Sequence, residues 1–208
     1  MTDRLSSLDS TFLELEQADE GATMHIGAAL VFDPVPATGG APPLDDLLAL
    51  LAERLGLLPR YRCRLSEPRA DGLRRPSWVP DPAFDIAAHV RHATLPAPGG
   101  TAELHDWLGD FWSHRLDRGR PLWEMTLVDG LEGGRWALAT KTHHAMVDGV
   151  GSVDVGHVLL DAEPAPRRRR RREAAARPGA APDAAESDGH GPGWLAAPAV
   201  AARVARAG

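Results

Sequence analysis

Trp136-Ala-Leu-Ala-Thr-Lys-Thr-His-His-Ala-Met-Val-Asp-Gly149 is the stretch around which the expected fold is organised. Its first five residues are mostly apolar and predict a short strand that leads to two adjacent histidines. An Asp-Gly pair follows, which is typical of a tight turn, and residues 150–160 then repeat apolar side chains at helical spacing. A strand that delivers histidine beside the start of a helix is a common way to hold a general base at a cleft. The pattern therefore favours a functional site over a core histidine followed by an ordinary turn.

The residue types at this site favour proton transfer over metal binding. Neighbouring side chains on a strand point to opposite faces, so His143 and His144 cannot easily hold one ion. No second histidine or carboxylate has suitable ligand spacing. A covalent nucleophile has weak support, because the only cysteine, Cys63, is distant in sequence and no Gly-x-Ser-x-Gly motif occurs. We expect one histidine to face the cleft as a base and the other to face inward as support.

The two residues after the histidines are expected to shape the loop. Asp148 follows too closely on the turn to orient the same imidazole, so it is expected to pair with an arginine or to cap the helix from Val150. Gly149 lets the backbone pass close to the site or adopt a positive φ.

Three motifs together resemble one protein family. His-His-Ala-Met-Val-Asp-Gly at 143–149 matches the HHxxxDG signature of the acyl-CoA-dependent acyltransferase and condensation-domain superfamily. The segment that begins Pro121, Leu122, Trp123 looks like the PLW segment of the bacterial wax ester synthase/diacylglycerol acyltransferases. The opening, with Leu-Asp at 8–9 and Met-His-Ile-Gly at 24–27, looks like the N-terminus of that family. The resemblance covers approximately residues 4–161, as the N-terminal half of such an enzyme.

This resemblance implies an O-acyltransferase that moves a fatty acyl group from acyl-CoA to diacylglycerol or a long-chain alcohol. His144 would be the general base, and the alcohol oxygen would attack the thioester directly, without an acyl-enzyme. Acyl-CoA is then a co-substrate, and neither a cofactor nor a metal is expected. Acylation of another hydroxyl, such as that of a polyketide or a sugar, stays open as an alternative.

The resemblance also implies roles for the other motif residues. It gives His143 a supporting role, Asp148 an ion pair that holds the loop, and Gly149 a role in substrate access. Pro121, Leu122 and Trp123 would be structural residues near the site. An arginine-rich patch is either a solvated face, a contact for CoA phosphates or the source of the partner of Asp148. Its members are Arg60, Arg62, Arg64, Arg69, Arg74 and Arg75.

The remaining sequence predicts an α/β fold of the two-layer α+β type, with a mixed sheet and helices packed on it. The resemblance implies one half of the chloramphenicol acetyltransferase-like/condensation-domain fold. Two hairpins are expected, one across Asp71-Gly72 and one across Gly133-Gly134. In the first helix we expect Leu8, Phe12 and Leu15 to pack on the core, with contact to lipid as the alternative. The expected helices cover 7–16, 44–57 and 102–116, and the expected strands cover 25–32, 60–65, 77–79, 84–95, 122–128 and 136–140.

Composition divides the chain into three segments. Residues 1–161 form the acyltransferase half-domain, 162–192 read as a disordered linker rich in Arg, Pro and Ala, and 193–208 begin a further segment. Six consecutive arginines run from Arg167 to Arg172 and either stay solvated or contact an anionic membrane or lipid-droplet surface. Nucleic acid is disfavoured as a partner, because no aromatic residues alternate with these arginines.

The family's C-terminal motifs have no counterpart in this sequence. We therefore expect a truncated fragment of a longer protein, a split enzyme whose C-terminal half is a separate chain, or self-association. A catalytically incomplete half-domain that acts only as a binding module is the alternative. The net charge is −6, no apolar stretch approaches the roughly 18 residues of a membrane span, and no leader pattern is present. With a single cysteine, these features predict a cytoplasmic protein. Peripheral contact with a membrane or lipid droplet stays open as an addition to this prediction.

Overall fold

A four-stranded mixed sheet forms the centre of the molecule, in the strand order β2-β7-β6-β5. The computed structural model describes residues 3–67 and 76–147. Strand β7 pairs antiparallel with both β2 and β6, whereas β5 pairs parallel with β6. The mixed sheet and the antiparallel β6–β7 hairpin confirm the prediction. The strands are β2 (His25–Phe32), β5 (Val90–Thr94), β6 (Trp123–Asp129) and β7 (Trp136–His143).

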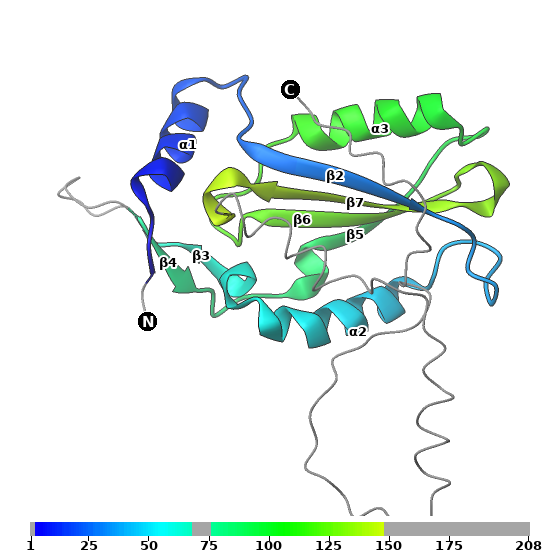
Figure 1. Ribbon diagram of the computed structural model, residues 1–208, viewed down its shortest axis with the longest axis horizontal. Helices are drawn as coiled ribbons and strands as arrows, with labels where there is room; N and C mark the ends of the chain where they lie inside the picture. The colour runs from blue at the N-terminus through cyan, green and yellow to red at the C-terminus, as the bar shows by residue number, and fades with distance from the viewer. Residues whose placement is uncertain (1–2, 68–75, 148–208) are drawn as a thin grey trace, which may run out of the picture.

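Two helices cover opposite faces of this sheet, α3 (Thr101–Ser113) on one and α2 (Leu44–Arg54) on the other (Figure 1). The expectation of two layers is therefore corrected to three. The alternation along β7 explains the third layer. Trp136 and Leu138 join the apolar cluster on the α2 side, while the small residues Ala137 and Ala139 join the cluster beneath α3. Because both faces of β7 are apolar, each face needs its own covering helix.

A second, smaller sheet contains one predicted strand pair and a short N-terminal strand that was not predicted. It has the order β1-β4-β3 and is antiparallel throughout. The pairing of β3 with β4 confirms the expected partnership of 60–65 with 77–79, although the Asp71-Gly72 turn lies outside the described residues. Its strands are β1 (Asp3–Arg4), β3 (Cys63–Leu65) and β4 (Ser77–Pro80).

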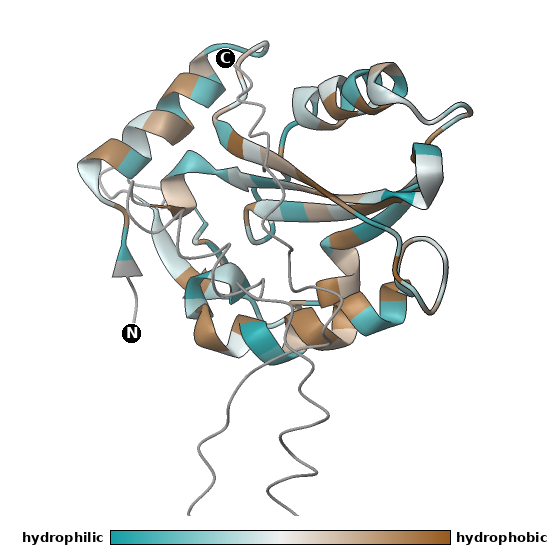
Figure 2. Cartoon of the chain, turned by 45° about the vertical axis from the view of Figure 1, so that its right-hand side comes forward, coloured by the Kyte–Doolittle hydropathy of each residue, from teal (hydrophilic) through white to brown (hydrophobic). Residues whose placement is uncertain are grey.

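Helix α1 (Ser7–Ala18) lies beyond one end of the central sheet (Figure 1). Its start is determined by a capping box, in which the Ser6 hydroxyl accepts from the Asp9 N–H and the Asp9 carboxylate accepts from the Ser6 N–H. The expectation that Leu8, Phe12 and Leu15 pack on the core is wrong for two of the three, because Leu8 is 64% and Leu15 is 48% exposed. The buried side instead carries Ser10, Leu13 and Glu16. Figure 2 shows the resulting alternation of apolar and polar segments along α1.

Two of the expected strands begin later than predicted. Residues 59–62 form a 3₁₀ turn (Pro59–Arg62) before β3, because a proline at the first position favours helical φ and lacks the N–H that a ladder needs. Residues 86–88 form another such turn (Ile86–Ala88), in which the Asp85 carboxylate accepts from the Ala87 N–H. The expected helix 44–57 likewise ends as α2 at Arg54 and continues as a 3₁₀ turn (Leu55–Leu57).

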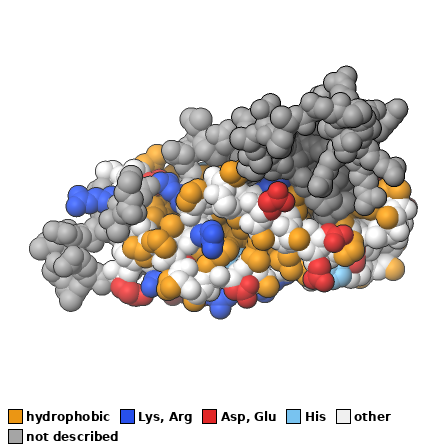
Figure 3. Space-filling model, turned by 90° about the horizontal axis from the view of Figure 1, so that it is seen from below, with side chains coloured by type: hydrophobic (Ala, Val, Ile, Leu, Met, Phe, Trp, Pro, Cys, Tyr) orange, Lys and Arg blue, Asp and Glu red, His pale blue; other side chains and the backbone are white. Residues whose placement is uncertain are grey.

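The outer surface of the α2 side carries charges of both signs among apolar atoms (Figure 3). In the described part of the chain, none of the helices combines the length and the apolar character that crossing a bilayer requires. The expected helix at 150–160, the linker and the final segment lie outside the described residues.

Candidate active site

The predicted histidines lie where β7 ends. His143 is the last residue of the strand and pairs across it with His25 of β2. His144 begins a 3₁₀ turn (His144–Met146). The backbone turns at this point because the His143 ring accepts a hydrogen bond from the Ala145 N–H at 3.0 Å and thereby caps the turn.

His143 is buried and only 1% exposed. Its backbone N–H donates to the Leu122 carbonyl at 2.9 Å. Because Nδ1 accepts from Ala145, the proton of the neutral ring must lie on Nε2, which faces a Glu16 carboxylate oxygen at 3.5 Å. Burial lowers the pKa of His143 to about 4, although the nearby Glu16 charge acts to raise it. His143 is therefore a neutral, inward-facing group at physiological pH.

His144 is only half-buried and differs from its neighbour in every contact. Its backbone N–H donates to the Met24 carbonyl at 2.9 Å. Its ring stacks on Phe12 of α1, with centroids 4.6 Å apart and planes inclined by 22°. Burial lowers the pKa of His144 below its ordinary value. No group within 3–67 or 76–147 hydrogen-bonds to its imidazole, so the neutral ring has a lone pair that can accept a proton.

Glu16 of α1 supplies a buried carboxylate beside the histidines, at 2% exposure. Arg118 donates to it from Nη2 at 2.8 Å and from Nε at 3.2 Å, and the Met24 N–H donates to its other oxygen at 3.2 Å. Burial acts to raise the pKa of Glu16, but these hydrogen bonds and the nearby charges outweigh it and hold the pKa below its usual value. Glu16 is therefore an ionised group within the site.

Lys141, the only lysine in the chain, lies two residues before His143 on the same face of β7. It is 2% exposed, and its ammonium group donates to the carbonyls of Phe111 and His114 at 3.1 and 3.0 Å. The Glu124 carboxylate lies 3.2 Å away. These carbonyls belong to the end of α3, where a cation is favourable. Lys141 thus links α3 to the strand that carries the histidines.

The PLW segment borders the site through its backbone. Pro121, Leu122 and Trp123 are all buried, and the Leu122 carbonyl is the acceptor for the His143 N–H. The Trp123 ring points to the other side of the sheet, where its indole N–H donates to the Tyr61 carbonyl at 2.8 Å. The ring of His89 stacks on it at 4.7 Å. The structure therefore brings PLW and the first histidine together, on adjacent strands.

The loop residues Asp148 and Gly149 lie outside the described residues, as do Arg69, Arg74 and Arg75. Among the other predicted arginines, Arg64 pairs with Glu67 at 3.4 Å, while Arg60 and Arg62 lie over the rings of Trp78 and Phe84. Within the residues that the structure describes, no three potential metal ligands converge.

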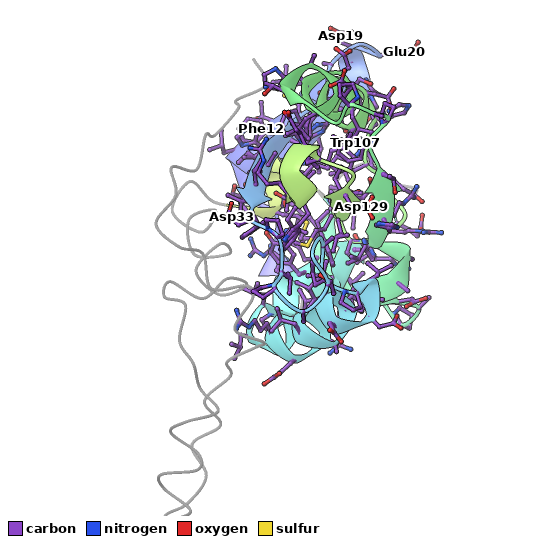
Figure 4. The ribbon with its side chains drawn as sticks, turned by 90° about the vertical axis from the view of Figure 1, so that its right-hand side faces the viewer. Phe12, Asp19, Glu20, Asp33, Trp107 and Asp129 are labelled. Carbon is purple, nitrogen blue, oxygen red and sulfur yellow. The ribbon has the colours of Figure 1, made fainter. Side chains whose placement is uncertain are left out.

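Sequence reasoning missed three residues of this site, which are Phe12, Glu16 and Arg118. Arg118 also donates to the Leu13 carbonyl at 2.7 Å, so it holds the end of α1 as well as the Glu16 carboxylate. A signal was present, since Glu16 follows Leu13 by three residues and thus shares its buried helix face. Figure 4 places Phe12 on α1 and shows the end of that helix, at Asp19 and Glu20, beside α3, where Arg115 donates to the Asp19 carbonyl.

The mixed sheet with a histidine pair at the end of β7 is one half of the chloramphenicol acetyltransferase-like fold. The solved starter condensation domain of rhizomide synthetase RzmA shares it, with a TM-score of 0.62 over 81% of this chain and 40% of that chain. At 16% identity, this likeness concerns the fold alone.

The chain belongs to the wax ester synthase/diacylglycerol acyltransferase catalytic-domain family, whose model matches residues 5–206. It is 41% identical over 161 residues to the probable diacylglycerol O-acyltransferase tgs3 of Mycobacterium tuberculosis, a match that covers 77% of this chain and 57% of tgs3. The solved wax ester synthase/diacylglycerol acyltransferase of Marinobacter aquaeolei VT8 is 36% identical, with a TM-score of 0.61 over 77% of this chain and 39% of that one. The chain thus spans 57% of the first relative and 39% of the second.

Proposed function

We propose that this chain carries the histidine-bearing half of an acyl-CoA-dependent O-acyltransferase. Its substrates are acyl-CoA and a diacylglycerol or long-chain alcohol. The family assignment and the names of the relatives support this reaction class. The observation that carries the proposal is His144, a half-buried imidazole in the turn directly after β7, to which no described residue hydrogen-bonds.

In the proposed reaction, a neutral His144 takes the proton of the acceptor hydroxyl as its oxygen attacks the thioester carbonyl. A tetrahedral intermediate forms at that carbon, the carbon–sulfur bond then breaks, and the new ester is released. The CoA thiolate leaves with the proton returned by the His144 imidazolium, so the histidine is regenerated without an acyl-enzyme. A pKa lowered by burial keeps His144 in the neutral form that this step requires.

The neighbouring motif residues support this site without entering the chemistry. His143 is unsuited to act as the base, because its Nδ1 is occupied by Ala145 and its Nε2 carries the proton. The PLW segment holds His143 through the Leu122 carbonyl. Asp148 is proposed to hold the following loop by an ion pair, and Gly149 is proposed to leave space for substrate.

The test is release of CoA thiol from palmitoyl-CoA by the purified chain, with hexadecanol or a diacylglycerol as acceptor. His144→Ala is expected to reduce the acceptor-dependent rate by at least about a hundredfold, the usual contribution of a general base. The matched control is His105→Ala on the exposed side of α3, which should leave the rate unchanged. Equal rates in wild type and His144→Ala would overturn the role of His144.

A binding module without catalysis is the second candidate function. The active channel of a full-length enzyme has to exclude water and align two substrates, which needs walls on both sides of the histidine. If wild type releases no CoA with any acceptor yet binds palmitoyl-CoA, this second function replaces the first for the isolated chain. Complementation by a family C-terminal segment then identifies a split enzyme.

A further inference from the structure

We propose that Glu16 is a positioning residue that determines which nitrogen of His143 carries the proton, and thereby holds the turn that presents His144. As a role in catalysis, this inference rests on the proposed function. As a statement about the His143 ring, it stands independently. Glu16 and His143 come from opposite ends of the described chain, and they meet in the interior at 2% and 1% exposure.

The surroundings of the Glu16 carboxylate consist of donors. One oxygen accepts from the Met24 N–H, and the other accepts from two nitrogens of Arg118. The third neighbour is Nε2 of His143, at 3.5 Å from the oxygen that Arg118 contacts. Of these three neighbours, only His143 can change from donor to acceptor, by moving its proton from Nε2 to Nδ1.

A shift of the His143 proton from Nε2 to Nδ1 is opposed by the group that faces Nδ1. Nδ1 accepts from the Ala145 N–H at 3.0 Å, and a proton on Nδ1 would set two donors against each other. Glu16 and the Ala145 N–H therefore select the same tautomer from opposite sides, as a carboxylate does when it orients a catalytic imidazole. The ring orientation and the backbone turn at 144–146 depend on each other through this hydrogen bond.

Glu16 also connects the turn to helix α1. The Met24 N–H donates to Glu16, while the Met24 carbonyl accepts from the His144 N–H. On the same helix, one turn earlier, Phe12 stacks on the His144 ring. A shift of Glu16 is therefore transmitted to His144 along two paths, through the His143 ring and through Met24.

Glu16→Gln tests this arrangement with a side chain of the same shape. One of its two terminal atoms becomes an NH₂ group, which must face Met24, Arg118 or His143, and each of these is a donor in the wild type. The only repair available is the opposite His143 tautomer, which breaks the contact with Ala145. Glu14→Gln is the matched control, because Glu14 lies on the same helix and is exposed.

Long-range ¹H–¹⁵N correlation spectra of the ¹⁵N-histidine-labelled chain measure the tautomer. The His143 signals are identified as those that disappear in the His143→Asn variant. We expect protonated Nε2 and unprotonated Nδ1 in wild type and in Glu14→Gln. Glu16→Gln should show the Nδ1-protonated form or a displaced Ala145 amide signal. It should also lower kcat about tenfold or more, with little change in KM for acyl-CoA, because the base is misplaced but acyl-CoA binding is retained.

Wild-type chain with the proton on Nδ1 of His143 overturns the proposal, and this result requires no variant to fold. An unchanged His143 tautomer and Ala145 amide in Glu16→Gln overturn it as well. Failure of the proposed function looks different, since wild type then releases no CoA while the tautomer spectra still respond to Glu16→Gln.

Discussion

The two adjacent histidines of one motif have opposite environments, and this difference follows from a single step along the backbone. His143 ends the strand and points into the interior, where its Nδ1 accepts from the Ala145 N–H and its Nε2 lies 3.5 Å from a Glu16 oxygen. His144 begins the turn and stacks on Phe12, with its ring half-buried. Burial lowers the pKa of both side chains, and within the part of the chain that the structure describes no group hydrogen-bonds to the His144 imidazole.

We expect the chain to lose stability on acidification, over the pH range between the folded-state and unfolded-state pKa values of His143. Its pKa is about 4 in the folded chain and near 6.5 in the unfolded chain, so the unfolded state binds more protons between these values. The free energy of unfolding therefore falls as the pH falls from about 6.5 toward 4, by up to about 3 kcal/mol from this residue. Glu16, whose pKa is also lowered, adds a further loss below its ordinary value of 4.5.

Urea unfolding at about pH 7 and about pH 5 measures this effect. The variant His143→Asn removes the titrating ring while its side-chain oxygen can still accept from the Ala145 N–H. It should show a smaller difference between the two pH values than wild type. The exposed His105→Ala serves as the control and should keep the wild-type difference. A pH dependence that is the same in all three proteins would contradict the prediction.

Among the secondary-structure elements, α3 is held on the sheet by small residues beneath it. Gly27 of β2 lies directly under Trp112, whose indole N–H donates to the Thr140 carbonyl of β7 at 3.2 Å. A Cβ atom at Gly27 would lie 2.4 Å from the Trp112 indole nitrogen, closer than any real contact allows. Lys141 completes the attachment at the end of the helix by donating to the carbonyls of Phe111 and His114.

Gly27→Ala is therefore expected to destabilise the chain by about 2 kcal/mol, because Trp112 must move and its hydrogen bond to Thr140 breaks. Gly109→Ala is the matched substitution within α3, where an added Cβ meets nothing within 4 Å. It should be neutral or stabilising by about 0.5–1 kcal/mol, since alanine is the better helix former. Urea unfolding of both variants decides the matter, and a Gly27→Ala variant as stable as wild type would refute the close contact.

For the molecule as a whole, we expect residues 3–147 to position the histidines and the arginine run at 167–172 to bind lipid. The sheet positions the histidines, whereas residues 167–172 lie outside the described structure and are proposed to contact anionic lipid. Six adjacent cations near such a surface contribute about 1 kcal/mol each. This contribution does not depend on the folded site.

Replacing all six arginines by glutamine should weaken binding to vesicles of phosphatidylcholine with anionic phosphatidylglycerol at least about tenfold. Wild-type binding should itself weaken as the salt concentration rises, because the interaction is screened. Cosedimentation measures both effects, and vesicles of phosphatidylcholine alone provide the control. Equal binding by wild type and the substituted chain would show that the run is only a solvated linker.

Several elements were predictable because their signals are local. The site strand, its hairpin with β6, and helix α3 follow from the periodicity of apolar residues and from the Gly133-Gly134 turn. The strands predicted at 60–65 and 84–95 began too early, because alternation of residue types does not distinguish a 3₁₀ turn from extended chain over four residues. The two-layer prediction rested on the order of strands and helices alone, and that order does not show which face of the sheet each helix covers.

The candidate site also has features that the sequence predicts and features that it does not. The family, the histidine motif and the PLW segment can be identified from the sequence, because each is a short run of residues whose identity and spacing carry the signal. The orientation of α1 cannot, and the apolar stripe of Leu8 and Leu15 proved to be exposed while Glu16 is buried. A buried carboxylate is stable there only because Arg118, 102 residues away, donates to it. The spacing of residues along the chain shows which side chains share a helix face. The distant residues that allow a charged face to be buried, such as Arg118, come close only when the chain folds.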